Sequence, residues 1–316
     1  MNSNYRFTIF TSCYNSKPFI YRLYDSLKKQ KFTNFEWLII DDYSQDGTRE
    51  ILEFIKNDAP FDVRVLYNKT NEMISYCCNL AVKKAQGEFF LFLDHDDELV
   101  PHALERFNDI WENIEPEKRV KLAGMISNCQ DQYGDFYIDE LPEPPSAINY
   151  YDMVHGVGIK GEKFFCYLTE IIQKNNFSTV DRYVPENLML LNISDNYDTF
   201  FFNENLRIYH VHQKNHQSLA NQLANNWKFQ FSVGMRFTKQ EDINRRAKRM
   251  LNNPVLFFTT IVNYLRFSSH ANISMQQSLL EINSNMLKLL LVIVLPIGKI
   301  LYMKDIYLSK KKINNN

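Results

Sequence analysis

The chain places four carboxylates within five residues, in the run Asp94-His95-Asp96-Asp97-Glu98. Side chains of one charge repel one another at this spacing, so either a cation neutralises them or solvent surrounds them freely. One interpretation is a divalent metal, held by hard oxygen ligands and shared with a phosphate-bearing substrate. The other is a solvated helix start, at which the carboxylates lie near the positive end of the helix dipole.

A second acidic segment begins with Asp41 and Asp42 and continues as Tyr-Ser-Gln-Asp-Gly-Thr to residue 48. Residues of these types are typical of a turn that caps the following helix. Both acidic segments follow short β-rich runs, which alternate with helical stretches from residue 6 to about residue 127. This alternation predicts βαβ units and a mostly parallel sheet.

The predicted strands place the polar segments at one edge of that sheet. The near-continuous apolar run at 89–93 is typical of a buried central strand. Further strands are predicted at 7–10, 37–40 and 63–67, and a helix at 74–85. Because an open sheet binds its ligand outside the carboxyl ends of its strands, the acidic segments are predicted to face one site.

Four segments in this order resemble the family 2 glycosyltransferases of GT-A fold. They are Thr-Ser-Cys-Tyr-Asn at 11–15, Ser-Leu-Lys-Lys-Gln at 26–30, the segment at 39–48 and Phe-Leu-Asp-His-Asp-Asp at 92–97. The resemblance covers roughly residues 5 to 212. It implies an α/β fold of GT-A type, Rossmann-like with a mostly parallel central sheet, and an inverting transfer of a sugar from a nucleotide diphosphate.

The resemblance also implies roles for single residues. It assigns the base and ribose to Thr11, Tyr14, Asp41 and Asp42, and the ribose and a Mg²⁺ or Mn²⁺ ion to Asp94, Asp96 and Asp97. Asp94 and Asp96 are the expected metal ligands, and either His210 or His212 could add a nitrogen ligand, because the two would share one face of a strand. Isolated histidines are nevertheless more often surface or hydrogen-bonded core residues.

The sequence departs from the family pattern at three positions. Ser12 stands where the family usually has proline, and Tyr43 where it often has glycine or asparagine. In the segment 75–79, Cys78 takes the place of an arginine. If that arginine helps to hold the diphosphate, this chain must find positive charge elsewhere.

The expected catalytic base is Glu186. An inverting transfer needs one carboxylate to take the proton of the acceptor hydroxyl. Many family members carry Glu-Asp at this place and use the aspartate, but Asn187 follows here. Asp181 is the reserve candidate, and the alternative for Glu186 is a plain role at the start of the helix that follows.

The C-terminal hundred residues differ in charge from the rest. From Gln217 onward there are 14 Lys and Arg against 4 Asp and Glu, a local charge of +10, which leaves −11 for residues 1–216. The apolar run at 289–298 is about ten residues, short of the roughly 20 that a spanning helix needs. Basic residues beside such a helix predict peripheral attachment to an anionic lipid surface. The alternatives are packing on the catalytic domain or a homo-oligomer interface, and nucleic acid is not expected because no binding motif accompanies the charge.

Composition narrows the compartment and the enzyme class. Five cysteines without a C-x-x-C spacing, and no apolar leader at the start, favour a reduced cytoplasmic setting, on the inner face of the cell membrane. Only 9 glycines are present, and no glycine-rich phosphate loop occurs. A sugar-phosphate nucleotidyltransferase, which needs such a loop, is therefore a lesser alternative.

Together these features predict a GT-A catalytic domain over 1–215 and a basic helical tail over 216–316. The nucleotide-sugar half is expected at about 1–127 and the acceptor half at about 128–215. The predicted activity is of hexosyltransferase type, from a UDP-sugar to a glycan or lipid-linked acceptor of a capsule or lipopolysaccharide. A membrane-associated scaffold that keeps the fold without catalysis is the alternative.

Overall fold

The computed structural model describes residues 4–135, 143–159, 161–211 and 229–314. The chain divides into two compact units. The sheet unit comprises Met1–Phe177 and Met189–Lys214, and the helical unit comprises Ser178–Leu188 and Asn215–Asn316. The segment Ser178–Leu188, which the sequence prediction put in the catalytic domain, thus groups with the C-terminal helices.

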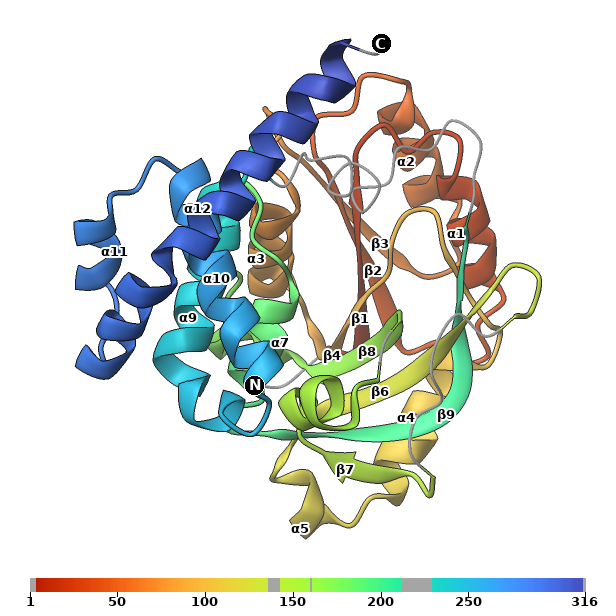
Figure 1. Ribbon diagram of the computed structural model, residues 1–316. Coiled ribbons are helices and arrows are strands. Elements are labelled where there is room, and N and C mark those ends of the chain that lie inside the picture. The colour runs from red at the N-terminus through yellow and green to blue at the C-terminus, as the bar shows by residue number, and fades with distance from the viewer. Residues whose placement is uncertain (1–3, 136–142, 160, 212–228, 315–316) are drawn as a thin grey trace. The chain divides into compact units, whose positions relative to one another are not determined.

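The sheet unit is built on a nine-stranded sheet in the order β3-β2-β1-β4-β8-β6-β9-β5, with β7 paired to β9 (Figure 1). Its first four strands are parallel, whereas β8 runs antiparallel to β4 and β6. The strands are β1 Tyr5–Cys13, β2 Phe35–Asp41, β3 Asp62–Tyr67, β4 Gly87–Phe92, β5 Glu98–Leu99, β6 Leu122–Asp131, β7 Ser146–Ile148, β8 Lys163–Leu168 and β9 Asp198–Tyr209.

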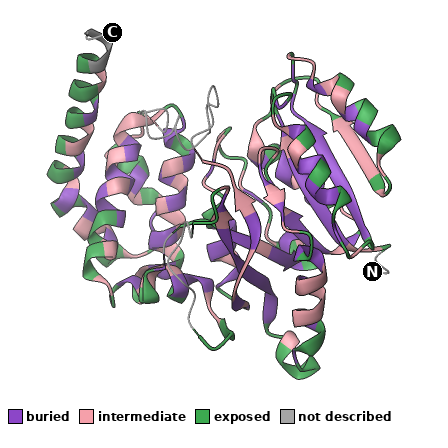
Figure 2. Cartoon of the chain, turned by 90° about the vertical axis from the view of Figure 1, so that its right-hand side faces the viewer, coloured by how far each residue is buried: buried purple, intermediate pink, exposed green. Residues whose placement is uncertain are grey.

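Helices cover both faces of this sheet. The helices of the unit are α1 Ile20–Lys28, α2 Thr48–Asp58, α3 Ile74–Lys84, α4 Ala103–Asn113, α5 Pro116–Arg119, the π-helix Asp152–Val157, α6 Thr169–Lys174 and α7 Asn187–Ile193, the last of which begins in the helical unit. The apolar stripes of α1, α2 and α4 pack on one face, against alternate residues such as Phe7, Trp37 and Phe89. Figure 2 shows the central strands almost wholly buried. Full burial stabilises each such side chain by roughly 1.5–3 kcal/mol.

The sheet confirms the predicted fold class. The observed β1, β2, β3 and β4 contain or overlap the four predicted strands, and α3 matches the predicted helix within one residue. Because β1, β2 and β4 are parallel neighbours, their carboxyl ends at Cys13, Asp41 and Phe92 lie along one edge. The two acidic segments leave the sheet at that edge, as predicted.

The helical unit consists mainly of α9 Ser232–Met250, α10 Pro254–His270, α11 Met275–Leu280 and α12 Asn285–Asn314. Its core joins Ile243 of α9, residues of α10 and the α12 side chains Leu287, Leu291 and Val294. Gly298 allows α12 to approach α10 closely, since a Cβ there would lie 2.7 Å from the Cβ of Leu265.

Two buried ionic networks fix these helices to one another. Arg236 of α9 donates to Ser268 Oγ at 2.9 Å and to the Tyr264 hydroxyl at 2.8 Å, and it pairs with Glu281. Asp305 of α12 accepts from Arg266 Nε at 2.6 Å and lies 2.9 Å from His270 Nε2, both on α10. The second network holds the far half of α12 against α10.

The length of α12 revises one prediction. The sequence analysis counted an apolar run of about ten residues, but the helix continues past Lys299 to Asn314. Among the described helices, α12 alone is long and apolar enough, over Asn285–Lys311, to cross a membrane by length and composition. The intervening lysines are spaced widely enough that they do not end the helix.

Candidate functional site

The loop after β1 and the turn after β2 are joined into one rigid wall at the carboxyl edge of the sheet. The backbone N–H of Asn15 donates to Ser44 Oγ at 2.9 Å, and that of Gln45 donates to Asn15 Oδ1 at 2.9 Å. The Ser16 N–H donates to Thr48 Oγ1 at 2.8 Å. Asn15 has a φ of 52°, in the left-handed region that asparagine tolerates.

Thr11 and Tyr14, both expected to face the base, differ in the structure. Thr11 is fully buried, and its Oγ1 accepts from the Trp37 indole at 3.0 Å. Its hydroxyl therefore holds strands β1 and β2 together and is not presented at the edge, which corrects the expected side-chain contact. The Tyr14 ring is 51% exposed and is free to pack against a ligand.

Asp41 and Asp42 are adjacent but hold different partners. Asp41 Oδ2 accepts from Arg49 Nε at 2.6 Å and from the Ser44 N–H at 3.2 Å. Its other oxygen, Oδ1, is buried and has no hydrogen-bond partner among the described residues. Because a buried carboxylate oxygen is costly when unsatisfied, a ligand N–H or an ordered water is the expected partner.

The Asp42 carboxylate instead accepts hydrogen bonds from the loop that precedes α3. Its Oδ1 accepts from Asn68 Nδ2 and from the Glu72 N–H, each at 2.8 Å, and its Oδ2 accepts from the Met73 N–H at 2.8 Å. The residue is 3% exposed. The structure thus shows Asp42 as the anchor of the 68–73 loop, with no free oxygen of the kind seen in Asp41.

Arg49 adds a cation that the sequence analysis did not single out. Its guanidinium carbon lies 5.8 Å from the centroid of the Tyr43 ring and 5.3 Å from that of the Tyr67 ring. Tyr43 has a φ of 72°, which explains why glycine or asparagine suits this position in the family. The two rings and Asp41 hold the guanidinium beside the turn.

The carboxylates after β4 are paired with an arginine from the far side of the sheet. Arg207 of β9 donates through Nε to Asp97 Oδ2 at 2.6 Å and through Nη2 to Asp94 Oδ2 at 2.6 Å. Asp97 is fully buried, whereas the Asp94 side chain is 62% exposed. Asp96 is partly exposed, and its carbonyl accepts from Arg22 of α1.

Asp97 is the buried carboxylate of this segment, whereas Asp94 and Asp96 are more exposed. Burial raises the pKa of Asp97 to about 7, with Asp94 and Asp96 acting in the same direction and Arg207 against it. Its Oδ1 also accepts the backbone N–H of His210 at 3.0 Å. Asp97 therefore positions β9, whereas Asp94 and Asp96 carry the carboxylates that solvent can reach.

Of the two histidines predicted as metal ligands, the structure describes His210 and does not describe His212. His210 Nε2 lies 2.8 Å from Glu98 Oε1, so this ring nitrogen is engaged by a neighbouring carboxylate. His212 lies outside the described residues. Among the residues that the structure does describe, no group of three or more His, Cys, Asp or Glu is arranged to hold a metal ion.

The carboxylates present nevertheless fit Mg²⁺ or Mn²⁺. Mg²⁺ is usually bound by only one or two protein carboxylates, and phosphate oxygens and waters complete its shell. Asp94 and Asp96 offer such hard oxygen ligands at a reachable surface. The donor set is therefore that of a cation shared with a phosphate-bearing substrate.

Positive charge at this edge comes from elements other than α3. Cys78, in the place of the family arginine, is 1% exposed and so cannot present a polar group to a ligand. Arg207 and Arg22 contact the 94–97 segment instead. The basic side chains at 69, 83 and 84, which are near in sequence, are exposed.

Glu186 and Asp181 lie in the helical unit and are described within it. Glu186 is exposed and directly precedes α7. Both Asp181 oxygens accept backbone N–H groups, Oδ1 from Arg182 at 2.8 Å and Oδ2 from Gly234 at 2.9 Å. The second bond satisfies a donor in the first turn of α9, so Asp181 acts as a cap of that helix.

Residues 8–117 match the family model described as Glycosyl transferase family 2. The poly(ribitol-phosphate) beta-N-acetylglucosaminyltransferase TarS of Staphylococcus aureus (strain Mu50 / ATCC 700699) is 36% identical over 102 residues, 32% of this chain and 18% of that protein. The putative teichuronic acid biosynthesis glycosyltransferase TuaG of Bacillus subtilis (strain 168) is 34% identical over 146 residues, 46% of this chain and 55% of that protein. The chain thus matches about half of the length of TuaG and far less of TarS.

Two solved structures share the fold over most of the chain. S. aureus TarS 1-349 in complex with UDP-GlcNAc has a TM-score of 0.54 at 17% identity, covering 93% of this chain and 90% of that one. The mannosyltransferase PcManGT from Pyrobaculum calidifontis, in complex with GDP-Man and Mn2+, has a TM-score of 0.56 at 14% identity, covering 99% and 87%. At these identities the likeness establishes the fold.

The sheet is therefore of GT-A type, and acidic segments leave it at its carboxyl edge. Residues 8–117 therefore form a glycosyltransferase family 2 domain. This confirms the resemblance seen in the four sequence segments.

Proposed function

We propose that the chain is a metal-dependent inverting glycosyltransferase that moves a sugar from a UDP-sugar to a hydroxyl of a glycan or lipid-linked acceptor in cell-surface polysaccharide synthesis. The observation that carries the proposal is the edge of the sheet. There the unsatisfied Asp41 oxygen, the exposed Tyr14 ring and the reachable carboxylates of Asp94 and Asp96 follow parallel neighbouring strands. Asp41 and Tyr14 would bind the nucleobase, and Asp94 would lie toward the diphosphate.

Asp94 and Asp96 would hold Mg²⁺ or Mn²⁺ between them and the diphosphate. The cation supplies Lewis-acid stabilisation of the leaving diphosphate when it is bound. Arg207 already neutralises part of the acidic charge at this place, and Arg22 holds the backbone of Asp96. Both arginines are therefore in a position to fix the carboxylates before the donor binds.

Glu186 is the proposed base that takes the acceptor proton. It is exposed at the position before α7. Both oxygens of the reserve candidate, Asp181, accept backbone N–H groups. The hydrogen bond from the Gly234 N–H gives Asp181 a structural role at the start of α9. This structural role of Asp181 supports Glu186 as the first candidate for the base.

The activity is tested by Mn²⁺-dependent release of UDP from a panel of UDP-sugars, with candidate glycan acceptors and the full chain. We expect Asp96→Ala to abolish release, while Asp25→Asn, which alters an exposed pair with Lys28 on α1, leaves it unchanged. Equal activity of Asp96→Ala and the wild-type chain would contradict the assignment. Release that responds to neither Mn²⁺ nor Mg²⁺ would contradict the metal.

Glu186→Gln is expected to abolish transfer and to leave UDP affinity within about twofold of the wild-type value, because the donor site belongs to other residues. Asn187→Ala, at the next exposed position, is the matched control. Unchanged turnover of Glu186→Gln would move the base to Asp181 or to another residue.

A scaffold that keeps the fold without catalysis is the second candidate, since buried Cys78 replaces a family arginine. The same assay distinguishes the two. Binding of UDP without release from any UDP-sugar would support the scaffold.

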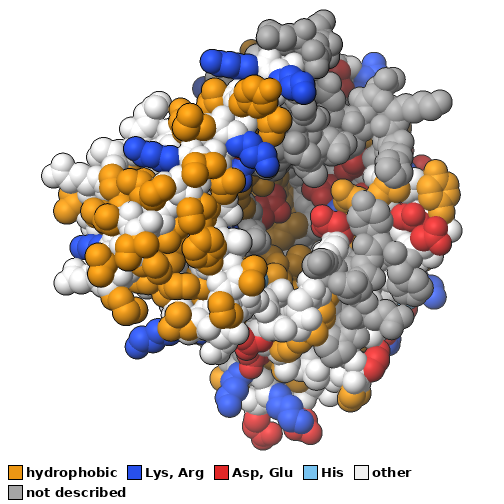
Figure 3. Space-filling view, viewed as in Figure 1, with side chains coloured by type: hydrophobic (Ala, Val, Ile, Leu, Met, Phe, Trp, Pro, Cys, Tyr) orange, Lys and Arg blue, Asp and Glu red, His pale blue; other side chains and the backbone are white. Residues whose placement is uncertain are grey.

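We also propose that the helical unit attaches to the cytoplasmic membrane surface through the outer face of α12. Leu289, Ile293 and Ile300 are 63%, 65% and 62% exposed, and Figure 3 shows hydrophobic side chains gathered over this helix. Lysines border the face at several positions, and such residues near a surface attract anionic lipid by about 1 kcal/mol each. Asp305 is held by Arg266 and His270, and moving this carboxylate into hydrocarbon would cost several kcal/mol, on the order of 3. An interfacial position is therefore favoured over a span.

The attachment is tested by Leu289→Glu with Ile293→Glu, and Leu280→Glu on α11, which is 75% exposed, serves as the control. These side chains lie outside the core, so the fold should persist. We expect the double variant to lose binding to anionic vesicles and the control to keep it. Unchanged vesicle binding would exclude the face, and a wild-type dimer that the double variant converts to a monomer would assign it to a homo-oligomer.

A further inference from the structure

Glu162 is a carboxylate of the sheet unit to which the proposed transfer gives no role. It directly precedes β8, and its side chain is exposed. It forms no hydrogen bond or ion pair with any residue that the structure describes. Desolvation on the protein side raises the pKa of its carboxyl group, Arg207 opposes this shift and Asp94 adds to it. Glu162 is therefore a reachable acid close to residues of the proposed metal site.

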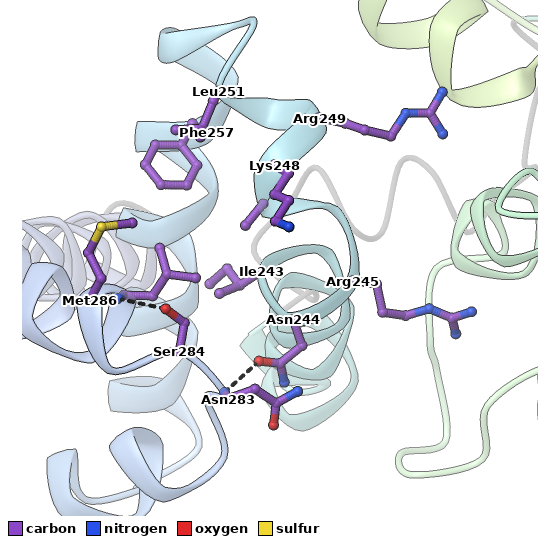
Figure 4. Close-up of a pocket in the computed structure, with 12 residues that line it drawn as sticks. Ile243, Asn244, Arg245, Lys248, Arg249, Leu251, Phe257, Asn283, Ser284 and Met286 are labelled. Carbon is purple, nitrogen blue, oxygen red and sulfur yellow. Dashed lines mark hydrogen bonds between the residues drawn. The ribbon is translucent and has the colours of Figure 1, made fainter.

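The pocket of about 440 Å³ in the helical unit, between α9, α10 and the start of α12, differs in this respect (Figure 4). Asn244 at this pocket donates to the Glu281 carbonyl at 2.9 Å and accepts from the Asn283 N–H at 3.0 Å. Its amide thus already has partners, and the rest of the lining is largely apolar. That pocket does not identify a ligand, whereas an acid at the donor edge does.

The pairing of β8 places Glu162 beside the acidic segment that follows β4. Because β8 runs antiparallel to β4, it begins at the edge where β4 ends. Leu91 pairs with Cys166. Three residues nearer the edge, Asp94 is therefore level with Lys163, the first residue of β8. Glu162 is one residue beyond this row, at the rim of the sheet.

The order of the strands along this edge matches the order of the groups in a nucleotide-diphosphate sugar. The strands β2, β1, β4 and β8 are neighbours in that order (Figure 1), and neighbouring strands are about 4.8 Å apart. In the proposed function the base lies at the ends of β2 and β1, by Asp41 and Tyr14, and the diphosphate lies at the end of β4, by Asp94. The sugar is bonded to the far phosphate, so the same direction brings it to the start of β8.

We propose that Glu162 is a specificity-determining residue that accepts hydrogen bonds from hydroxyl groups of the donor sugar and restricts the donor to neutral sugars. The proposal rests on the proposed function, because it needs a UDP-sugar at this edge. An ionised carboxylate has only acceptor atoms, which suit sugar hydroxyls. A uronic acid would bring a second carboxylate to the same place, and like charges at short range repel each other.

The cations near Glu162 are not presented to a uronic acid. Arg207 already pairs with Asp94 and Asp97. Lys163 is only 5% exposed. The charge that a donor sugar meets at the start of β8 is therefore that of Glu162.

The test measures the binding of UDP, UDP-glucose and UDP-glucuronic acid to the full chain by calorimetry in the presence of Mn²⁺. The two sugars differ only in a hydroxymethyl group against a carboxylate, and UDP-galactose with UDP-galacturonic acid gives a second matched pair. In at least one pair we expect the wild-type chain to bind the neutral sugar at least about tenfold more tightly, the usual contribution of one hydrogen bond to a charged group.

Glu162→Gln keeps the shape of the side chain and removes its charge. A neutral hydrogen bond is about half as strong as a charged one, so the neutral UDP-sugar should bind about fivefold more weakly and the preference over the uronic acid should fall to about twofold. The affinity for UDP should not change, because UDP carries no sugar. Glu170→Gln is the matched control, since Glu170 is exposed, pairs with Lys174 and follows the other end of β8; it should change none of these affinities.

Circular dichroism checks that each variant is folded. Absence of the preference in both pairs for the wild-type chain, or its persistence in folded Glu162→Gln, would overturn the role of Glu162 alone if UDP still binds. Equal weakening of UDP and the UDP-sugar by Glu162→Gln would also overturn it, since the residue would then act on the diphosphate. A wild-type chain that does not bind UDP would overturn the proposed function and this role with it.

Discussion

Asp42→Asn tests whether this carboxylate anchors a loop. The aspartate accepts three hydrogen bonds at 2.8 Å from Asn68, Glu72 and Met73. Asparagine keeps one acceptor oxygen, so the bond from the Met73 N–H is lost, at about 1.5–3 kcal/mol for a charged acceptor. The other two bonds lose their charge assistance, which about halves their strength. Together these losses predict a destabilisation of at least about 3 kcal/mol.

For a unit of this size, 3 kcal/mol corresponds to a fall in Tm of about 6–12 °C. Thermal unfolding followed by circular dichroism, with a urea titration of the same variant, measures the change. Asp25→Asn is the matched control, because its carboxylate is exposed and pairs with Lys28 in the same helix. The anchoring interpretation is refuted if Asp42→Asn lowers Tm no more than Asp25→Asn does.

Asp41→Asn removes the charged acceptor at the proposed nucleobase site. A charged hydrogen bond contributes about 1.5–3 kcal/mol, so UDP affinity should fall about 10- to 150-fold. A change below twofold by calorimetry would contradict this prediction. Burial acts to raise the pKa of Asp46, but hydrogen bonds from Thr48 and Lys17 outweigh it and hold the pKa below its ordinary value. The charged Asp46 therefore stabilises the fold above the pKa of the unfolded chain, and this stability is lost as the pH falls through the lower pKa of the folded chain. Below about pH 4 the urea midpoint of Asp46→Asn should fall less than that of the wild-type chain. Parallel curves of urea midpoint against pH would refute this prediction. Gly234→Ala would drive a Cβ into the Tyr183 carbonyl, so we expect a loss of about 1–3 kcal/mol and lower turnover with UDP affinity kept; unchanged Tm and turnover would show that α9 can shift freely.

The sheet could be predicted from the sequence because its strands carry local signals. The apolar runs at 37–40 and 89–93 are buried strands, and the polar turns follow them directly. Parallel neighbours then bring distant turns to one edge, which is a rule of the fold and needs no side-chain detail. This is why the donor edge could be located before its contacts were known.

The partners of the site residues could not be predicted in the same way. Asp41 and Asp42 look equivalent in sequence, but successive side chains at a strand end point to opposite faces, so one meets Arg49 and the other the 68–73 loop. Arg207 lies 110 residues after Asp97, and only the pairing of β9 into the sheet brings them together. The residues next to Asp97 in the sequence give no signal of this contact.

The buried position of Cys78 also limits which side chains this position can hold. An arginine there would have to bury five N–H donors in a place where the thiol is 1% exposed. A single reverse substitution would therefore damage the packing of α3 before it could restore any contact with a phosphate. Restoring a cation at this position would therefore require changes to the neighbouring side chains as well as to Cys78.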